Sequence, residues 1–294
     1  MDLHVVGIRY GDSRPGGRYG AAVEAYRQSG VFEELTGGGD LTVREPAFPE
    51  ARRTEDPIAN LGAIGGEVAN AVAEGVRAGR RVAIVGGNCS HLPGVLGGLQ
   101  DALGPTTKIG LVWFDAHGDV NTPRTTPSGM LGGMPVAVSA GLCHATWREG
   151  SHQAVPLPTN RIVMVDVRNL DPEEERLVRA TDVTIARVAD GFSGDVPLAD
   201  AVQRLADTCD YLYLHIDSDV LDASLTPNHG TKEPGGPGVA ETLAAVDTVL
   251  DTGKVVAFGL VSVNPEGEGG DVSLNAALEL LRGSLSHWGV TSDE

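Results

Sequence analysis

Short apolar runs alternate along the chain with longer segments in which apolar residues recur every three or four positions. The apolar runs predict strands, at residues 3–8, 81–87, 108–117, 161–168, 211–219 and 254–263. The helical period predicts helices, at residues 57–78, 91–103, 198–208, 239–251 and 271–285. Asp56 and Pro57 supply an N-cap and a first turn for the first of these helices. Residues 171–175 (DPEEE) read as a further helix start.

Strands that are apolar at nearly every position, alternating with helices, indicate an α/β fold with a parallel sheet covered on both faces. The chain shows no repeat, low-complexity linker or break in composition, so residues 1–294 are expected to form a single domain. Three long segments rich in Gly, Pro and polar residues are expected to be loops, at 36–56, 118–135 and 220–238. The last two follow strand ends, where open parallel sheets bind their ligands.

Charge and cysteine content narrow the possible partners. The 294 residues include 22 Lys and Arg against 40 Asp and Glu, a net charge of −18, which disfavours nucleic acids and anionic membrane surfaces as partners. No apolar run reaches the ~18 residues that span a bilayer, and the N-terminus lacks signal-peptide features. Three cysteines argue against a disulfide framework and for a reducing, cytoplasmic location.

Acidic residues gather at the ends of two predicted strands. The segment FDAHGDVN places Asp115, His117 and Asp119 at alternate positions, and HIDSDVLD does the same with Asp217 and Asp219. Alternate side chains of an extended backbone leave the same face, so each set is expected to converge. A single such Asp fits a helix cap or a loop. Two clusters of buried carboxylates must either raise their pKa or bind a cation, and we expect a cation. Oxygen ligands with one imidazole suit Mn²⁺, and their number favours two ions.

Three motifs resemble the signature motifs of the arginase/agmatinase ureohydrolase family, in the same order and with similar spacing. They are GGNCSH (86–91), DAHGDVN (115–121) and HIDSDVLDA (215–223), and the resemblance covers roughly residues 80–280. It implies a three-layer α/β/α sandwich with a mostly parallel, about eight-stranded sheet and two Mn²⁺ ions per chain. It also implies hydrolysis of a small guanidino substrate to urea and an amine, by a homo-oligomer that is a trimer or hexamer.

The same resemblance implies a role for each metal ligand. Asp115 and Asp217 would bridge the two ions, and His117 and Asp219 would complete the coordination of one of them. Asp119 and the residue at position 89 would complete the other. Asp119 would also orient the attacking water by a hydrogen bond.

Four further residues match family positions that bind an amino-acid substrate. Asn121 and Ser128 match positions that contact its α-carboxylate, and Asp171 and Glu174 match a segment that contacts its α-amino group. The two acids also fit an ordinary helix start, where the helix dipole favours negative charge. Both interpretations of these acids stay open.

Position 89 departs from the family pattern. Where the family carries Gly-Gly-Asp-His-Ser, this chain has Asn88 in place of Asp and Cys89 in place of the His ligand. His91 is an alternative ligand two residues on, and Cys89 also fits a small buried residue. A ligating Cys89 would be a thiolate, whose extra negative charge lowers the Lewis acidity of the metals.

The substrate-facing positions depart in the same direction. Gly132 replaces a His that moves a proton, Met130 replaces a substrate-binding Asn, and Ser262 replaces the Glu that pairs with the guanidinium. A guanidinium is always charged, and its burial without a carboxylate is unfavourable. Ser262 is therefore expected to face a less basic group, an N-hydroxyguanidine. His229 is a candidate for the proton transfer, or only a loop residue.

These departures resemble the Cys-ligand N-omega-hydroxy-L-arginine amidinohydrolases of antibiotic biosynthesis, which are arginase relatives. An ordinary arginase or agmatinase is the first alternative. A second alternative is a non-catalytic, ureohydrolase-like binding subunit, although such a protein would not need to keep all four aspartates and His117. A third is a deacylase of similar fold, although two acidic clusters fit two ions better than the single zinc of deacetylases.

Overall fold

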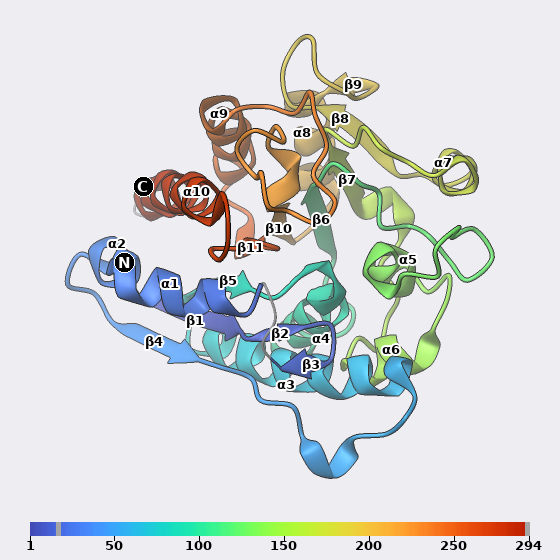
Figure 1. Cartoon of the computed structure of the whole chain (residues 1–294), viewed down its shortest axis with the longest axis horizontal. Coiled ribbons are helices and arrows are strands. Elements are labelled where there is room, and N and C mark those ends of the chain that lie inside the picture. Colours follow the sequence, from blue (N-terminus) through green and yellow to red (C-terminus); the bar gives the residue numbers. More distant parts are fainter. Residues whose placement is uncertain (16–18, 292–294) are drawn as a thin grey trace.

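A nine-stranded parallel sheet forms the centre of the protein (Figure 1). The computed structural model describes residues 1–15 and 19–291. The strand order is β4-β1-β5-β11-β10-β6-β7-β8-β9, and every neighbouring pair is parallel. The strands are β1 (Leu3–Ile8), β4 (Leu41–Arg44), β5 (Arg81–Gly86), β6 (Ile109–Phe114), β7 (Ile162–Val165), β8 (Thr184–Arg187), β9 (Val196–Pro197), β10 (Tyr211–Asp217) and β11 (Val255–Val261). A separate antiparallel pair is formed by β2 (Tyr10–Gly11) and β3 (Arg14–Pro15).

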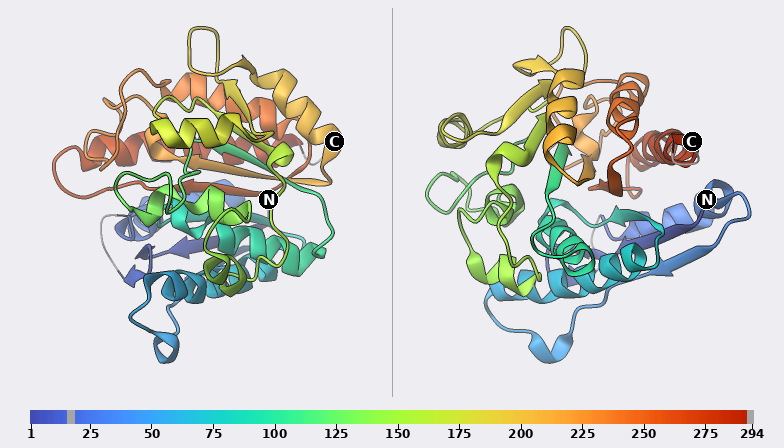
Figure 2. Two further views of the ribbon diagram at one scale, coloured as in Figure 1. Left: turned by 90° about the vertical axis from the view of Figure 1, so that its right-hand side faces the viewer. Right: turned by 180° about the vertical axis from the view of Figure 1, so that it is seen from behind.

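Helices cover both faces of the sheet, so the predicted three-layer α/β fold is confirmed (Figure 2). One layer contains α3 (Pro57–Arg77), α4 (Leu92–Leu103) and α5 (Pro135–Ser139). The other contains α1 (Ala21–Ser29), α2 (Val31–Thr36), α8 (Leu198–Thr208), α9 (Val239–Leu250) and α10 (Gly270–Thr291). The other two α-helices among the described residues are short: α6 (Ala145–Gly150) and α7 (Pro172–Arg179).

Alternate side chains of one strand enter different cores, which is why the strands are apolar at nearly every position. In β1, Leu3 and Val5 pack with α1, α2 and α10, whereas Val6 and Ile8 pack with α3 and α4. All four side chains are buried.

The helix predictions agree closely with the structure. Asp56 caps α3 as expected, because its side chain accepts a hydrogen bond from the Ile58 amide at 2.9 Å. The predicted bounds of α8 are those observed, and α10 continues beyond residue 285 to Thr291. No helix among the described residues is long and apolar enough to cross a lipid bilayer.

Several strands end earlier than the apolar runs predict, and the reason is local backbone conformation. The predicted strand 161–168 ends at Val165, and 254–263 ends at Val261. Asp166 and Ser262, which directly follow β7 and β11, have φ of 61° and 62°. This left-handed conformation turns the chain out of the sheet.

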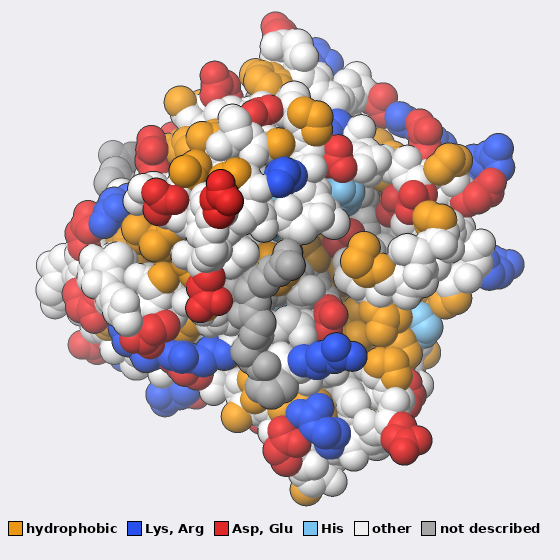
Figure 3. Space-filling view, viewed as in Figure 1, with side chains coloured by type: hydrophobic (Ala, Val, Ile, Leu, Met, Phe, Trp, Pro, Cys, Tyr) orange, Lys and Arg blue, Asp and Glu red, His pale blue; other side chains and the backbone are white. Residues whose placement is uncertain are grey.

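The sequence pattern does not predict several short elements. The segment 36–56, expected to be a loop, contains the edge strand β4, whose four residues, three half-buried and one exposed, are too few to show a period. The short helices α1, α2, α5 and α6 and the strand β8 were not predicted either. On the face shown in Figure 3, Asp and Glu side chains are interspersed with Lys and Arg rather than gathered by sign.

The strand order brings the carboxyl ends of the four central strands together. β5 and β6 follow one another among the long strands of the chain, but β11 and β10 lie between them. Where strands from a later part of the chain lie between two earlier ones, the strand order reverses, and a crevice forms there beyond the carboxyl ends of the strands. The carboxyl ends of β5, β11, β10 and β6 therefore meet at one edge.

Candidate metal centre

Each of the four central strands delivers predicted site residues to the carboxyl end of the sheet. Cys89 follows β5, Ser262 follows β11, and Asp217 ends β10 with Asp219 just beyond it. The segment after β6 supplies the remaining three, Asp115, His117 and Asp119.

Three overlapping groups of side chains each bring their ligand atoms within 4.8 Å of one another. They are Cys89–Asp115–Asp119, Asp115–His117–Asp219 and Asp217–Asp219–His229. His117 joins the two strand tips, since its Nδ1 lies 3.3 Å from Asp115 Oδ1 and 3.2 Å from Asp219 Oδ2. The predicted convergence of the two acidic strand ends is confirmed.

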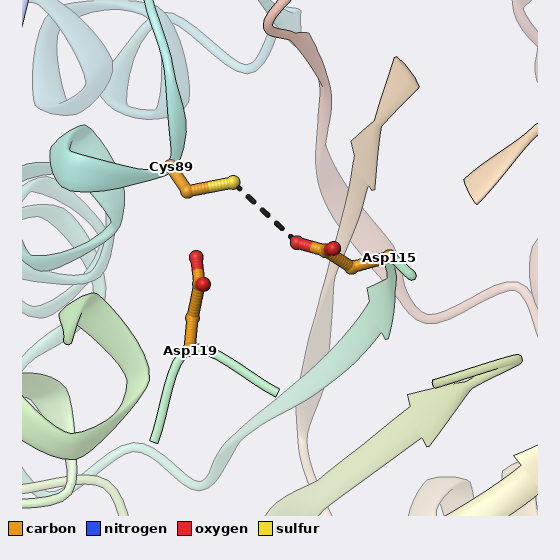
Figure 4. A group of neighbouring side chains, drawn as sticks. All are labelled: Cys89, Asp115 and Asp119. Atoms are coloured by element: carbon orange, nitrogen blue, oxygen red, sulfur yellow. Dashed lines mark hydrogen bonds between the residues drawn. The ribbon is translucent and has the colours of Figure 1, made fainter. Parts of the chain in front are cut away.

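Cys89 points into this cluster, whereas His91 points away from it. Figure 4 shows the Cys89 sulfur and the Asp115 and Asp119 carboxylates facing a common point. The sulfur lies 3.7 Å from Asp115 Oδ2 and 2.9 Å from Asp217 Oδ2. His91 instead uses Nε2 to contact the Tyr10 carbonyl oxygen at 3.0 Å. Of the two candidates at this motif, the structure brings only Cys89 to the carboxylates.

Asp119 does not converge on the cluster by the alternation of side chains along an extended strand, so that part of the prediction is wrong. The chain after β6 is not extended, and Asp119 has φ of 50°, in the left-handed region. Its carbonyl oxygen accepts hydrogen bonds from the Val136 and Ala137 amides at 3.0 and 3.3 Å, so the start of α5 holds this turn. The turn, rather than strand alternation, brings the Asp119 carboxylate back toward Asp115.

Without a cation, the buried groups of the cluster have pKa values that are shifted in different directions. Burial, reinforced by the neighbouring carboxylates, raises the pKa of Asp115, Asp119 and the Cys89 thiol well above their ordinary values. Burial opposes protonation of His117, but contacts with Asp115 and Asp219 outweigh it and raise its pKa to about 12. Burial also opposes ionisation of Asp217, yet the nearby His229 ring and hydrogen bonds from Cys89 and Ser262 hold its pKa below the ordinary value.

This donor set fits divalent cations. Carboxylates and a thiol that retain protons only because they are buried together become ligands when a cation takes the place of those protons. Four carboxylates, one imidazole and one sulfur also exceed what a single ion needs.

The same shifts predict how the stability of the metal-free protein depends on pH. Asp115, Asp119 and His117 have higher pKa values folded than unfolded, so the folded state binds more protons. Their stabilising contribution is complete below the unfolded values and is lost as pH rises. Buried histidines whose pKa is lowered, such as His215, act in the opposite sense only below about pH 7. The melting temperature of chelator-treated protein should therefore fall between pH 7 and pH 9, and saturating Mn²⁺ should remove most of that fall. A metal-free melting temperature that rises over this range would contradict the assignment.

One cavity of about 200 Å³ collects all the residues predicted for the site. Its floor is the buried cluster around Cys89, Asp115 and Asp217, and Ser128 and Met130 are exposed at its mouth. The other predicted residues that line it are His117, Asp119, Asn121, Asp171, Glu174, Asp219, His229 and Ser262.

Asp171 and Glu174 close the start of α7 and also face the cavity. Glu174 accepts hydrogen bonds from the Asp171 amide at 3.3 Å and from the Val120 amide at 2.8 Å. Asp171 accepts one from the Asn121 side-chain amide at 2.9 Å. The helix-start interpretation is thus satisfied, and it does not exclude a contact with substrate.

The positions that depart from the family pattern leave neutral groups in the cavity wall. Ser262 donates a hydrogen bond to Asp217 Oδ2 at 2.5 Å, so its hydroxyl contacts the acidic cluster directly. At Gly132, an added Cβ would meet nothing nearer than Met130 Cγ at 3.9 Å and Asn88 Nδ2 at 4.0 Å. Asn88 is held by Asp12, with which it exchanges two hydrogen bonds.

Sequence reasoning missed several residues around the cluster. Glu233 Oε1 lies 3.6 Å from His117 Nε2 and accepts a hydrogen bond from the Asn169 side chain, and Thr231 donates to Asp219 Oδ2 at 3.0 Å. Arg168 fixes this segment by donating to the carbonyl oxygens of Asp219, Leu221 and Glu233. No local motif marks Glu233 among the other acids of the chain, because its role depends on the path of the 220–238 loop.

The arginase-family model matches residues 7–286, nearly the whole chain. The chain belongs to the arginase family. Arginase from Agrobacterium fabrum is 30% identical over 272 residues, covering 88% of this chain and 82% of that protein. Arginase from Bacillus caldovelox is 30% identical over 221 residues, covering 74% and 73%.

Solved structures of the family have the same fold as this ureohydrolase. Bacillus caldovelox arginase superposes with a TM-score of 0.80 at 25% identity, covering 97% of this chain and 98% of that one. Formimidoylglutamase from Bacillus subtilis superposes with a TM-score of 0.70 at 15% identity, covering 99% and 88%. A fold shared by proteins with such different names does not choose the substrate.

Family membership and the clustered ligands make the protein a binuclear-metal ureohydrolase that acts on guanidino compounds. This favours an enzyme over a non-catalytic subunit and gives no support to the deacylase alternative. The identity of the metals and the substrate is a separate question, which depends on residues particular to this chain.

Proposed function

We propose that this ureohydrolase hydrolyses the N-hydroxyguanidino group of an arginine-like amino acid, N-omega-hydroxy-L-arginine being the best candidate. The observation that carries the proposal is the neutral wall beside the acidic cluster. Ser262, Gly132 and Asn88 line the cavity there. Among the described lining residues, the carboxylates outside the cluster are Asp171 and Glu174, at the start of α7.

A neutral wall favours a weakly basic reactive group. A guanidinium has a pKa above ~12 and enters a buried site as a cation, so it needs a carboxylate partner. The electron-withdrawing hydroxyl of an N-hydroxyguanidine lowers its basicity, so the group can be bound without that partner. The position where the family carries a Glu holds Ser262, which has a short neutral side chain.

The proposed ligand set places two Mn²⁺ ions between the strand tips. Asp115 and Asp217 would bridge the ions, with His117 and Asp219 completing one coordination sphere and Asp119 and Cys89 the other. A pair of divalent ions, when bound, lowers the pKa of water and stabilises the negative charge that develops during its attack.

Asp119 and His229 divide the remaining work of the reaction. Asp119 accepts a hydrogen bond from the attacking water and orients it toward the guanidino carbon. The ring of His229 is buried; its Nδ1 accepts a hydrogen bond from the Thr231 amide at 3.2 Å, so the neutral ring carries its proton on Nε2. That Nε2 lies 3.4 Å from Asp217 Oδ1 and has no hydrogen-bond partner among the described residues.

The general acid is the protonated ring of His229. Burial opposes its protonation, but the carboxylates of Asp217 and Asp219 outweigh burial and raise the pKa of His229. In that form the Thr231 hydroxyl, 3.3 Å from Nδ1, can accept the second ring proton. Water adds to the guanidino carbon, the bond from that carbon to the chain nitrogen breaks, and the nitrogen takes the Nε2 proton of the His229 imidazolium. One proton of the water returns to the ring, and the other passes to the N-hydroxy nitrogen as the new carbonyl group forms. The products are hydroxyurea and the free amine.

The mouth of the cavity suits the α-groups of an amino acid. Ser128 presents a hydroxyl there, and Asn121 retains one side-chain N–H beyond the one donated to Asp171, so both can donate to an α-carboxylate. Asp171 and Glu174 supply acceptors for an α-ammonium group.

A comparison of three substrates tests the proposal. Hydroxyurea release from N-hydroxyarginine should have a higher kcat/KM than urea release from arginine, and agmatine should be poorest because it lacks the α-carboxylate. The names of the relatives favour a second candidate, hydrolysis of arginine itself. Faster turnover of arginine than of N-hydroxyarginine would establish that alternative and refute the proposal.

Three further expectations from the sequence stay predictions. These are a single domain over residues 1–294, a trimeric or hexameric assembly, and a cytoplasmic location. Light scattering of the purified, Mn²⁺-loaded protein tests the assembly.

A further inference from the structure

A buried histidine that the reaction does not use lies behind Cys89. His215 is on β10, 1% exposed, and its ring stacks on Trp113 of the neighbouring strand β6, with centroids 4.0 Å apart and planes within 4°. Its Nε2 lies 3.4 Å from Cys89 Sγ, and its Nδ1 lies 2.8 Å from the Tyr213 hydroxyl. The ring therefore connects the sulfur to a buried tyrosine.

The hydrogen-bond partners decide which ring nitrogen carries the proton. Within the described part of the chain, His215 Nδ1 is the hydrogen-bond partner of the Tyr213 hydroxyl, which is fully buried. If Nδ1 carried the proton, the hydroxyl would accept it and its own proton would be left unpaired, at a cost of about 1–3 kcal/mol. If the hydroxyl donates to Nδ1, no polar hydrogen is left unpaired. The proton of the neutral ring is then on Nε2, facing the sulfur.

We infer that His215 is a positioning residue that donates its Nε2–H to Cys89 Sγ and thereby stabilises the sulfur as a thiolate ligand. This inference rests on the proposed ligand role of Cys89. The donors run in one direction, from Tyr213 to His215 to Cys89, and the sulfur in turn lies 2.9 Å from Asp217 Oδ2. When a cation binds, the thiol proton leaves and the Nε2–H remains.

The hydrogen bond from His215 to Cys89 offsets the electrostatic cost of a thiolate ligand. A thiolate in place of a neutral imidazole adds one negative charge to a cluster that already holds four carboxylates. An N–H donor withdraws electron density from the sulfur, which weakens its donation and returns Lewis acidity to the metals. Trp113 holds the ring in the orientation that this bond requires.

Cobalt substitution tests the inference through absorption rather than activity. The Co²⁺-loaded protein should show a sulfur-to-cobalt charge-transfer band that Cys89→Ser abolishes. In Tyr213→Phe/His215→Phe, which removes both polar partners while keeping ring volume, the band should move to longer wavelength or vanish. Metal affinity, measured by chelator competition, should fall by roughly 10–100-fold.

Two further variants keep the test decisive. His4→Phe removes an equally buried histidine of β1, which contacts Thr42 on β4 and Ala71 on α3, and it should leave the band unmoved. Tyr213→Phe alone, the milder change, should give a smaller shift in the same direction. An unmoved band and unchanged affinity in the double variant would overturn this inference alone. A wild-type protein without the band would overturn the ligand role of Cys89 and this inference together, whereas hydroxyurea release tests the proposed reaction separately.

Discussion

Replacing Asp115 with asparagine is expected to abolish hydrolysis and, at the same time, to make the metal-free protein more stable at neutral pH. Asp115 is 2% exposed, and burial together with Asp219 raises its pKa, so folding it in its ionised form is costly without a cation. Asparagine keeps the oxygen that accepts the His117 amide hydrogen bond at 2.6 Å but carries no charge. The same change removes a ligand that both ions would share.

The rate and the melting temperature should therefore move in opposite directions. Loss of the metal pair removes several kcal/mol of transition-state stabilisation, so kcat/KM should fall by at least about 1,000-fold. The melting temperature of chelator-treated Asp115→Asn should exceed that of the chelator-treated wild type, and the rise on adding Mn²⁺ should be lost. Asp190→Asn makes the same change at an exposed aspartate and should alter neither quantity. An Asp115→Asn protein that is active within tenfold of wild type would refute the assignment.

Replacing His229 with asparagine should lower kcat by ~10²–10⁴-fold, the range for loss of a general acid, while metal content stays unchanged. The reason is the orientation of the ring: Nδ1 faces Thr231, so Nε2 is the nitrogen from which the protonated ring can donate to the leaving group. The cluster Asp217–Asp219–His229 also permits the opposite role, in which His229 binds metal. Metal analysis separates the two, since a variant that loses an ion would show His229 to be a ligand.

A second imidazole should rescue the His229 variant. Gly132 has open space around an added Cβ, so Gly132→His can place a ring in the cavity without displacing its neighbours. In the His229→Asn background it should recover part of the lost kcat. His152→Asn is the matched control for His229→Asn and should leave kcat unchanged. His152 contacts Asp101 away from the cavity, and asparagine tolerates its φ of 63°. Failure of the rescue, with the metal retained, would mean that proton donation does not limit the reaction.

The sequence predicts most of the sheet and the convergence of the acidic strand ends, for a physical reason. Parallel strands that are buried on both faces are apolar throughout, so Asp115 and Asp217 stand out as the first charges after long apolar runs. Their strands are neighbours in the sheet, which the pattern alone does not reveal, but all carboxyl ends lie at one edge in any parallel arrangement.

What the sequence does not reveal depends on backbone turns and on contacts between distant segments. The approach of Asp119 requires a left-handed turn at a non-glycine residue, and although Asp adopts this conformation more readily than most residues, it does so too rarely for the sequence to mark the turn. The contact between Cys89 and His215 joins residues 126 positions apart, and Glu233 reaches His117 only because Arg168 holds the loop. The edge strand β4 was missed because pairing with β1, rather than its own pattern, defines it.

The most direct test of the account is a crystal structure of the Mn²⁺-soaked protein with anomalous difference density. Two peaks about 3.5–4 Å apart are predicted, both in contact with Asp115 and Asp217, with Cys89 Sγ bound to one of them. A single peak, or two peaks that leave Asp217 or Cys89 without a metal contact, would contradict it.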